Sequence, residues 1–503
     1  MYKLRSIAGL VIAAVLITGC ASGTVQRPAD LTELSVTDAA QLIRAGKVSS
    51  VELTEAYLAK ADRNKHLNAF ITLDHGKARA AAEQADAARA AGRGKGALHG
   101  VPLVVKDNIH VAGMPNTAGT PALRNFVPAT NAPVVQKLVD AGAIVLGKTN
   151  MHELAFGISG YNEGFSQVEP IGVRNPYDRN RFAGGSSSGT GAAVGGRLAP
   201  GGLGTDTGGS VRVPAAVNGI AGLRPTIGRY SNEGLTPISY TRDTAGPLAQ
   251  TVADVALLDA VITGEKLVGA AKLEGVRVGV NRAYYFAGLD ADTTTVMDDV
   301  IVKLQRAGVE IVEVEMPELA DLNNRTSFPV ALYEAYDDLA KYLRKYNVGV
   351  TVEDVAAQIA SKDVKATYVG LVVPRKLPGP DGLMDAKPVY EAAIGQARPA
   401  LQKHYADTFA KNRIEALLFP ATSSVAITQG PEASSFENLL RFIRNADPGS
   451  NAGIPGLVVP AGLGPSTKMP VGIELDGPAG SDRRLLELGL AIEKVLGRTP
   501  APR

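Results

Sequence analysis

The sequence predicts an α/β fold in a single large domain, and three observations support this. Segments with helical periodicity alternate with short apolar, strand-like segments along the whole chain, as in α/β proteins. The 503 residues are 45% hydrophobic and 20% charged, so the chain is long enough and apolar enough for a large buried core. We identify no interdomain linker and no repeat of about 20–50 residues.

The N-terminal half supplies helices first and then apolar strands. Ser49-Ser50-Val51-Glu52 has the pattern of a capping box, in which the serine and the glutamate each bond a free backbone N–H at the start of a helix. The expected elements are, in order, a helix from this box to about Arg63, a strand at 67–73, an alanine-rich helix at 77–91, a strand at 101–105 that delivers Lys106, and a strand at 142–149.

The second half continues the alternation after a Gly/Ser-rich region. Residues 317–411 are predicted to be mostly helical, with a Pro/Gly-rich interruption at Pro374. The other expected elements are a helix capped by Thr251, a strand at Val276, a helix at 292–306, a strand at Val309, late strands at Glu415, Gly456 and Pro470, and a final helix from about Ser481.

The charge balance argues against a nucleic-acid partner. The formal net charge is +2, and no basic tract is longer than the "DRR" that ends at Arg484. Proteins that bind nucleic acids normally carry a strongly basic patch that neutralises phosphates. We therefore expect none here.

Residues 1–19 have the pattern of an export signal. Lys3 and Arg5 precede an apolar run of eleven residues, 7–17, which is about half the ~20 residues that span a bilayer. Cys20, the only cysteine, follows "LITG" and resembles the lipid-attachment cysteine of a bacterial lipobox. The resemblance implies a lipid on Cys20, a tether at 20–30, the folded domain at 31–503 and a periplasmic, membrane-anchored protein. A short membrane anchor or a buried helix is the alternative for the apolar run, and an inert small hydrophobe is the alternative for Cys20.

Two short motif matches do not fit their surroundings. Gly142–Thr149 satisfies the phosphate-loop pattern, but its variable positions are Ala, Ile, Val and Leu, which favour a strand over a loop. Gly185–Gly189 satisfies the nucleophile-elbow pattern around Ser187, which requires a preceding strand and a later acid and histidine. The preceding residues are polar, and the only later histidine, His404, lies in a predicted helix. We expect no histidine-based triad.

A serine nucleophile without histidine needs another base, and a neutral lysine is the candidate. An ordinary lysine titrates roughly three units above pH 7, so holding it neutral costs about 4 kcal/mol unless burial disfavours the charge. Lys106, at the end of an apolar strand, is placed where such burial can occur. The adjacent Asp107 could instead keep it charged, and a strand-end lysine can also extend to water.

Four segments together resemble the amidase signature family of serine hydrolases. They are "PLVVKDNI", "AGGSSSGTGAAVGG", "GTDTGGSVRVPA" and "GLRPT", which begin at Pro102, Ala183, Gly204 and Gly222. The resemblance extends from about Thr37 to Val495 and is strongest between His99 and Asp259. It implies a central mixed β-sheet covered by helices on both faces.

The resemblance also assigns roles within the Gly/Ser-rich region. It implies Ser210 as the nucleophile, Ser186 as the bridging cis-serine and Lys106 as the base. The backbone N–H groups that it implies for the oxyanion hole are those of Thr207, Gly208, Gly209 and Ser210. Small side chains there leave the N–H groups accessible to a developing negative charge.

The neighbouring Asp206 and Arg212 are interpreted as a structural ion pair. No metal and no organic cofactor are expected, because the remaining histidines share no ligand spacing.

These roles imply hydrolysis of a small carboxylic acid amide to the acid and ammonia or an amine, through an acyl-enzyme on Ser210. Segments 238–264 and 450–489 resemble indoleacetamide and mandelamide hydrolases more than the transamidase subunit that forms Gln-tRNA. Two alternatives are a lipid-anchored binding protein without turnover and an amidotransferase-like subunit acting on a larger acyl substrate. We expect residues 317–411 to wall the substrate entrance, although their aromatic side chains can equally belong to the core.

Overall fold

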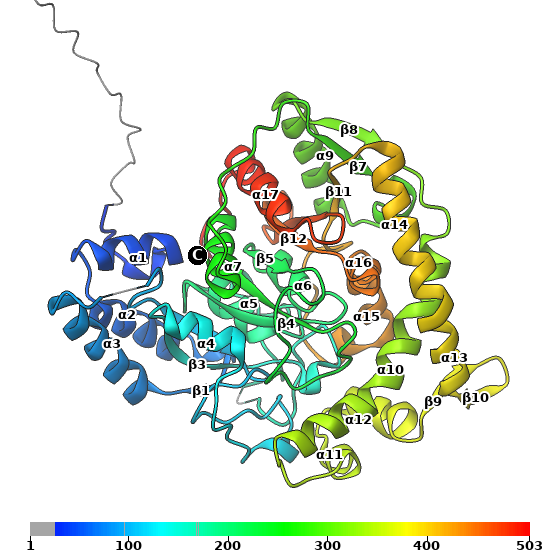
Figure 1. Cartoon of the computed structure of the whole chain (residues 1–503), viewed down its shortest axis with the longest axis horizontal. Helices are drawn as coiled ribbons and strands as arrows, with labels where there is room; N and C mark the ends of the chain where they lie inside the picture. The colour runs from blue at the N-terminus through cyan, green and yellow to red at the C-terminus, as the bar shows by residue number, and fades with distance from the viewer. Residues whose placement is uncertain (1–25, 95, 167, 170, 503) are drawn as a thin grey trace, which may run out of the picture.

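The computed structural model describes residues 26–94, 96–166, 168–169 and 171–502, which fold around one mixed β-sheet (Figure 1). Cys20 and the predicted signal at 1–19 lie outside the described residues. Eleven strands of the described chain form this sheet in the order β1-β3-β2-β4-β6-β5-β12-β13-β11-β7-β8. They are β1 (Phe70–Leu73), β2 (Pro102–Lys106), β3 (Ile144–Thr149), β4 (Gly201–Asp206), β5 (Ala221–Arg224), β6 (Thr244–Ala249), β7 (Arg277–Val280), β8 (Glu310–Glu313), β11 (Ala416–Pro420), β12 (Gly456–Leu463) and β13 (Pro470–Asp476).

Helices cover the sheet on both faces, which confirms the predicted architecture. Strands β2, β4, β5, β6, β11 and β13 are buried at every position. Because successive side chains point to opposite faces of a strand, burial at every position requires cover on both sides. Pairing is parallel for β3-β2-β4 and for β11-β7-β8, and antiparallel elsewhere in the sheet.

The helices of the described chain follow the predicted order, with several short ones added. They are α1 (Val36–Arg44), α2 (Ser50–Arg63), α3 (His75–Ala90), α4 (Pro133–Asp140), α5 (Ser188–Gly195), α6 (Arg212–Val217), α7 (Val252–Thr263), α8 (Arg282–Tyr285), α9 (Ala291–Arg306), α10 (Leu319–Lys345), α11 (Val352–Gln358), α12 (Lys362–Thr367), α13 (Ala386–Ala392), α14 (Arg398–Asn412), α15 (Phe436–Ile443), α16 (Asp447–Ala452) and α17 (Asp482–Leu496). The predicted capping box is present at the start of α2, where Ser49 and Glu52 bond each other's backbone N–H groups. The interruption near Pro374 contains a separate hairpin, β9 (Lys376–Gly379) and β10 (Gly382–Asp385).

The central strands β4, β5 and β6 were not predicted from the sequence, because they are rich in glycine and poor in branched side chains. Their glycines permit unusually close packing. A Cβ on Gly202 would lie 2.4 Å from the carbonyl oxygen of Val104, and one on Gly246 would lie 2.2 Å from that of Leu223. These glycines therefore allow neighbouring chain segments to pack closely, and strand propensity does not reflect this role.

The start of the described chain contacts the folded body. Arg27 forms an ion pair with Glu52 at 3.1 Å, and Asp30 caps a short 3-10 helix at Leu31–Glu33. Among the described residues, no helix has both the length and the apolar character needed to span a membrane.

Candidate active site

Lys106 is fully buried at the end of β2, between β3 and β4. Its Nζ lies 2.7 Å from Oγ of Ser186 and 2.8 Å from Oγ1 of Thr205. Burial lowers the pKa of the Lys106 amine to about 7, although the negative charges of Asp206 and Asp243 oppose the shift. A substantial fraction of this amine is therefore neutral near pH 7 and able to accept a proton.

The structure also shows why the adjacent carboxylate does not hold Lys106 charged. Asp107 pairs with Lys148 of β3, with Oδ1 and Nζ 3.3 Å apart and both side chains fully buried. The other carboxylate oxygen accepts hydrogen bonds from the backbone N–H and the hydroxyl of Thr117. Asp107 is thus committed to partners other than Lys106.

Ser186 lies in the glycine-rich loop that leads into α5. The peptide bond between Gly185 and Ser186 is cis, and Gly184 has a positive φ of 67°. The loop is fixed by Ser187, whose hydroxyl donates to the carbonyl of Thr205 at 3.1 Å and whose N–H donates to the carbonyl of Ser210 at 3.2 Å. This places the Ser186 loop against both β4 and the Ser210 segment.

The two candidate serines are neighbours without a direct hydrogen bond between their hydroxyls. Among the described residues, Oγ of Ser186 hydrogen-bonds to Lys106 alone. Ser210 is 7% exposed and lines a pocket, whereas Ser186 and Lys106 are wholly buried. Catalytic hydrogen bonds often form only once substrate is bound, so this separation is compatible with proton transfer between the serines.

The segment after β4 presents backbone N–H groups to the same pocket. Thr207, Gly208 and Ser210 line the pocket, and their N–H groups hydrogen-bond to no other described residue. The resemblance also implied the N–H of Gly209 as an oxyanion-hole donor. In the structure this N–H instead donates to the Asp206 carboxylate at 2.9 Å. Three N–H groups therefore remain for a substrate oxygen.

Asp206 holds this segment in place through a buried charge cluster. Arg212 and Arg224 lie 3.1 Å and 2.9 Å from its Oδ1, and all three side chains are inaccessible to solvent. Burial opposes ionisation, but the two guanidinium groups outweigh it and hold the pKa of Asp206 well below its usual range. The Asp206–Arg212 pair was expected from the sequence, whereas the contribution of Arg224 was not.

A second buried carboxylate, Asp243, supports Thr207 and was not identified from the sequence. It accepts a hydrogen bond from the Thr207 hydroxyl at 2.5 Å and from the N–H groups of Ile238 and Ser239 at 2.8 Å and 2.9 Å. Burial raises its pKa to about 6. No local pattern separates this aspartate from others in the sequence.

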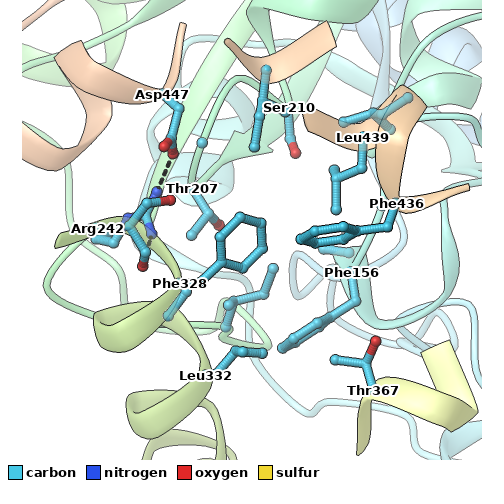
Figure 2. Close-up of a pocket in the computed structure, with 18 of the residues that line it drawn as sticks. Phe156, Thr207, Ser210, Arg242, Phe328, Leu332, Thr367, Phe436, Leu439 and Asp447 are labelled. Carbon is cyan, nitrogen blue, oxygen red and sulfur yellow. Dashed lines mark hydrogen bonds and ion pairs between the residues drawn. The ribbon is translucent and has the colours of Figure 1, made fainter. Parts of the chain in front are cut away.

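The pocket above Ser210 is largely apolar and has a volume of about 180 Å³. Figure 2 shows Phe156, Phe328, Phe436, Leu332 and Leu439 surrounding it, with Ser210 at one edge. Helices α10, α12 and α15 supply much of the wall, including Ser327, Phe328, Ala331, Leu332, Thr367, Phe436, Leu439 and Ile443.

The aromatic residues of the 317–411 region divide between pocket and core. Phe328 lines the pocket. Tyr342 is buried, with its hydroxyl 2.7 Å from Nε2 of His110.

The remaining candidates lie apart from this pocket. His404 is on α14 and lines a separate surface hollow with Arg282 and Glu313. Residues 144–149 form strand β3, as expected in place of a phosphate loop. Within the described residues, no three His, Cys, Asp or Glu side chains lie close enough together to ligate a metal ion.

Comparison with known proteins shows the family. The model of the Amidase family matches residues 52–486, so the chain belongs to the amidase family. The chain is 46% identical over 477 residues to mandelamide hydrolase of Pseudomonas putida, covering 95% of this chain and 94% of that protein. It is 41% identical over 469 residues to an indoleacetamide hydrolase of Agrobacterium vitis, covering 92% and 97%. The crystal structure of peptide amidase from Stenotrophomonas maltophilia superimposes with a TM-score of 0.76 at 31% identity, covering 94% of this chain and 98% of that one.

Proposed function

We propose that this amidase-family enzyme hydrolyses a small, aryl-bearing carboxylic acid amide to the acid and ammonia or an amine, through an acyl-enzyme on Ser210. The observation that carries the proposal is the fully buried Lys106 amine, 2.7 Å from Ser186 and with a pKa lowered to about 7. A lysine in this state is a base matched to neutral pH, which is what a serine nucleophile without histidine requires.

The acylation step follows from this arrangement. Neutral Lys106 takes the proton of the Ser186 hydroxyl, and Ser186 takes the proton of Ser210. Oγ of Ser210 then forms a bond to the amide carbonyl carbon. The carbonyl π electrons move to the oxygen, which accepts hydrogen bonds from the unpaired N–H groups of Thr207, Gly208 and Ser210. Each such donor is typically worth about 3–4 kcal/mol in the transition state.

The proton relay runs in reverse when the tetrahedral intermediate collapses, and it operates again during deacylation. The C–N bond breaks as the leaving nitrogen receives the proton returned through Ser186 from Lys106. Water then attacks the Ser210 ester, giving up its proton along the same route, and the carboxylic acid departs as Ser210 regains its hydrogen. The Asp206 and Asp243 carboxylates keep the 207–210 segment in position throughout.

The dimensions of the pocket support a small aryl substrate. A cavity of about 150 Å³ lined by apolar side chains accommodates a benzene ring, and this pocket measures about 180 Å³. Phe156, Phe328 and Phe436 offer ring faces and edges for such a group (Figure 2). The size fits the amides in the names of the mandelamide and indoleacetamide hydrolases better than a larger acyl substrate.

Labelling with a fluorophosphonate probe tests the proposal. The wild-type protein should be labelled on Ser210 and should hydrolyse phenylacetamide, whereas Ser210→Ala should lose both properties. Ser188→Ala, at the first residue of α5, is a matched control, because the Ser188 hydroxyl is buried without a hydrogen-bond partner in the described structure. Labelling or near-wild-type turnover in Ser210→Ala would overturn the assignment, and binding without labelling would favour the binding-protein alternative.

We also propose that the protein is exported and held at a bacterial membrane by a lipid on Cys20. The support is the pattern of the first 20 residues: a basic start, a short apolar run and a single cysteine in a lipobox-like context.

A further inference from the structure

The buried Lys106 amine contacts three oxygen atoms, and two of them belong to Thr205, near the end of β4. Nζ of Lys106 lies 2.7 Å from Oγ of Ser186, 2.8 Å from Oγ1 of Thr205 and 3.4 Å from the carbonyl oxygen of Thr205. All three residues are buried. The proton relay uses the contact with Ser186 and leaves both contacts with Thr205 without a role.

The number of acceptors matches the protonated form of the base. An ammonium carries three N–H donors and no lone pair, and the three oxygen atoms can each accept one hydrogen bond from it. A neutral amine has two N–H groups and one lone pair, so one of the three oxygens must then donate to the nitrogen. In the relay the donor is the Ser186 hydroxyl. The two oxygens of Thr205 therefore accept from Lys106 in both forms.

Three carboxylates lie near Lys106, but among the described residues none of them hydrogen-bonds to its amine. Asp107 of β2 pairs with Lys148 of β3. Asp206, at the end of β4, pairs with two arginines, and Asp243, just before β6, accepts hydrogen bonds from three other groups. A buried ammonium without a counter-ion in contact depends on neutral oxygen atoms to replace the water that it has lost.

The surrounding structure holds both oxygens of Thr205 in place. Nδ2 of Asn108 donates to Oγ1 of Thr205 at 3.0 Å and to the carbonyl of Thr236 at 3.3 Å. The Ser187 hydroxyl accepts from the N–H of Thr205 at 3.2 Å and donates to its carbonyl at 3.1 Å. The two acceptors are thus positioned before Lys106 takes up a proton.

We propose that Thr205 is a positioning residue that stabilises the ammonium formed when Lys106 takes the proton of Ser186, and that it thereby sets the strength of the base. The inference rests on the proposed amidase function and adds a residue to its catalytic apparatus. A hydrogen bond to the charged form of a group favours that form. Loss of the Thr205 hydroxyl should therefore make Lys106 a weaker base, while the contact with the backbone carbonyl remains.

The pH dependence of kcat/KM for phenylacetamide distinguishes this role from a structural one. In Thr205→Val and Thr205→Ala proteins, the midpoint of the ascending limb should move about one to two pH units lower, as expected for the loss of one hydrogen bond to a charged group. The plateau should fall severalfold, because a weaker base removes the Ser186 proton less readily. Thr205→Ser keeps the hydroxyl and should restore both values to near wild type.

Thr149→Val is the matched control, at the last residue of β3. In the described structure its buried hydroxyl lies 2.7 Å from that of Thr190 and is not a partner of the Lys106 amine. This variant also loses a buried threonine hydroxyl from a strand next to β2, so its stability should fall. Its midpoint should stay at the wild-type pH.

A direct titration makes the test independent of turnover. Ser210→Ala protein retains the buried amine, and NMR of isotope-labelled lysine Nζ can follow it, with the Lys106 signal assigned by its loss in Lys106→Ala. Adding Thr205→Val or Thr205→Ala to this protein should lower the pKa of Lys106 by the same one to two pH units, about the worth of one hydrogen bond to a charged group.

The outcomes separate this inference from the proposed function. A midpoint and a pKa that stay at the parent values would make Thr205 a structural residue and overturn the inference. A move to higher pH would show that Thr205 donates to the neutral amine, and would also overturn it. A lowered pKa of Lys106 in a protein without amide hydrolysis would support the inference and overturn the proposed function, and an unchanged pKa in such a protein would overturn both.

Discussion

At the scale of single residues, the ionisation of Lys106 controls the proposed chemistry. Its pKa of about 7 means that the neutral, proton-accepting form increases as pH rises through neutrality. We expect kcat/KM to rise with pH, with a midpoint near 7, and to level off above about pH 8. Lys106→Ala should lower kcat by about a thousandfold or more and remove this ascending limb. Steady-state kinetics between pH 5 and pH 10 would measure both effects.

The matched variant at this position is Lys106→Arg, which keeps the positive charge but cannot accept a proton. It should be as inactive as Lys106→Ala. His404→Ala, on a surface hollow lined by α14, should retain the wild-type profile. Wild-type-like activity in Lys106→Arg would show that the charge of the lysine matters and its lone pair does not, and the relay would then be wrong.

At the scale of elements, the glycines of β4 allow this strand to pack closely against the loop that carries Ser186. A Cβ on Gly204 would lie 2.5 Å from Oγ of Ser187, inside the loop that carries Ser186. Gly204→Ala should therefore push β4 away from α5, destabilise the protein by about 1–3 kcal/mol and reduce kcat as Thr205 shifts from Lys106. Chemical denaturation and kinetics would measure these effects.

Gly269→Ala is the control for this substitution, since Gly269 is exposed and its added Cβ would meet no atom within 4 Å. Its effect should stay within about 0.5 kcal/mol. A Gly204→Ala protein as stable and active as the Gly269→Ala protein would contradict the packing argument.

The short helix α12 lines the pocket with Thr367, and His152 and Glu153 bind the start of this helix and the residues before it. Nε2 of His152 lies 2.9 Å from Oδ2 of Asp363, and the buried Glu153 carboxylate accepts the N–H groups of Ala360 and Ser361. Asp363→Ala should loosen this wall, which includes Thr367, and so raise KM severalfold with a smaller change in kcat. Hydrogen exchange of residues 359–372 should become faster.

The exposed neighbour Lys362 provides the control, and Lys362→Ala should change neither KM nor hydrogen exchange in this region. If Asp363→Ala left KM and exchange at wild-type values, the His152 contact would have no part in holding the wall.

At the scale of the whole molecule, the lipid proposed on Cys20 would determine where the protein resides. If Cys20 carries a lipid, the wild-type protein should sediment with bacterial membranes and incorporate a radiolabelled fatty acid. Cys20→Ala should lose the label and leave the membrane fraction or accumulate unprocessed. Thr24→Ala, a short distance further along the chain, is the control and should behave as wild type. Identical labelling and fractionation of the wild-type and Cys20→Ala proteins would contradict lipid anchoring.

Most strands and long helices of the fold could be predicted from the sequence, but β4, β5 and β6 in the middle of the sheet could not. The capping box of α2 and the apolar strands β2 and β3 carry local signals, namely side-chain caps and runs of branched residues. Strands β4, β5 and β6 carry glycines in their place, because neighbouring backbone (at Gly202 and Gly246) or neighbouring side chains (at Gly204 and Gly222) leave no room for a Cβ. That requirement comes from segments distant in sequence, so no local pattern expresses it.

The features of the candidate site also divide into those that the sequence determined and those that depend on the tertiary structure. The sequence by itself determined which groups are available: Lys106, Ser186, Ser210 and the glycines between them, identified as candidates by the resemblance of their segments to the amidase signature family. Only the tertiary structure decided that Asp107 pairs with Lys148, that Lys106 is therefore buried without a carboxylate in contact, and that two oxygen atoms of Thr205 contact its amine. The physical reason is that residue types and short spacings are local properties, whereas desolvation and the choice of an ionic partner depend on which distant segments close around a side chain.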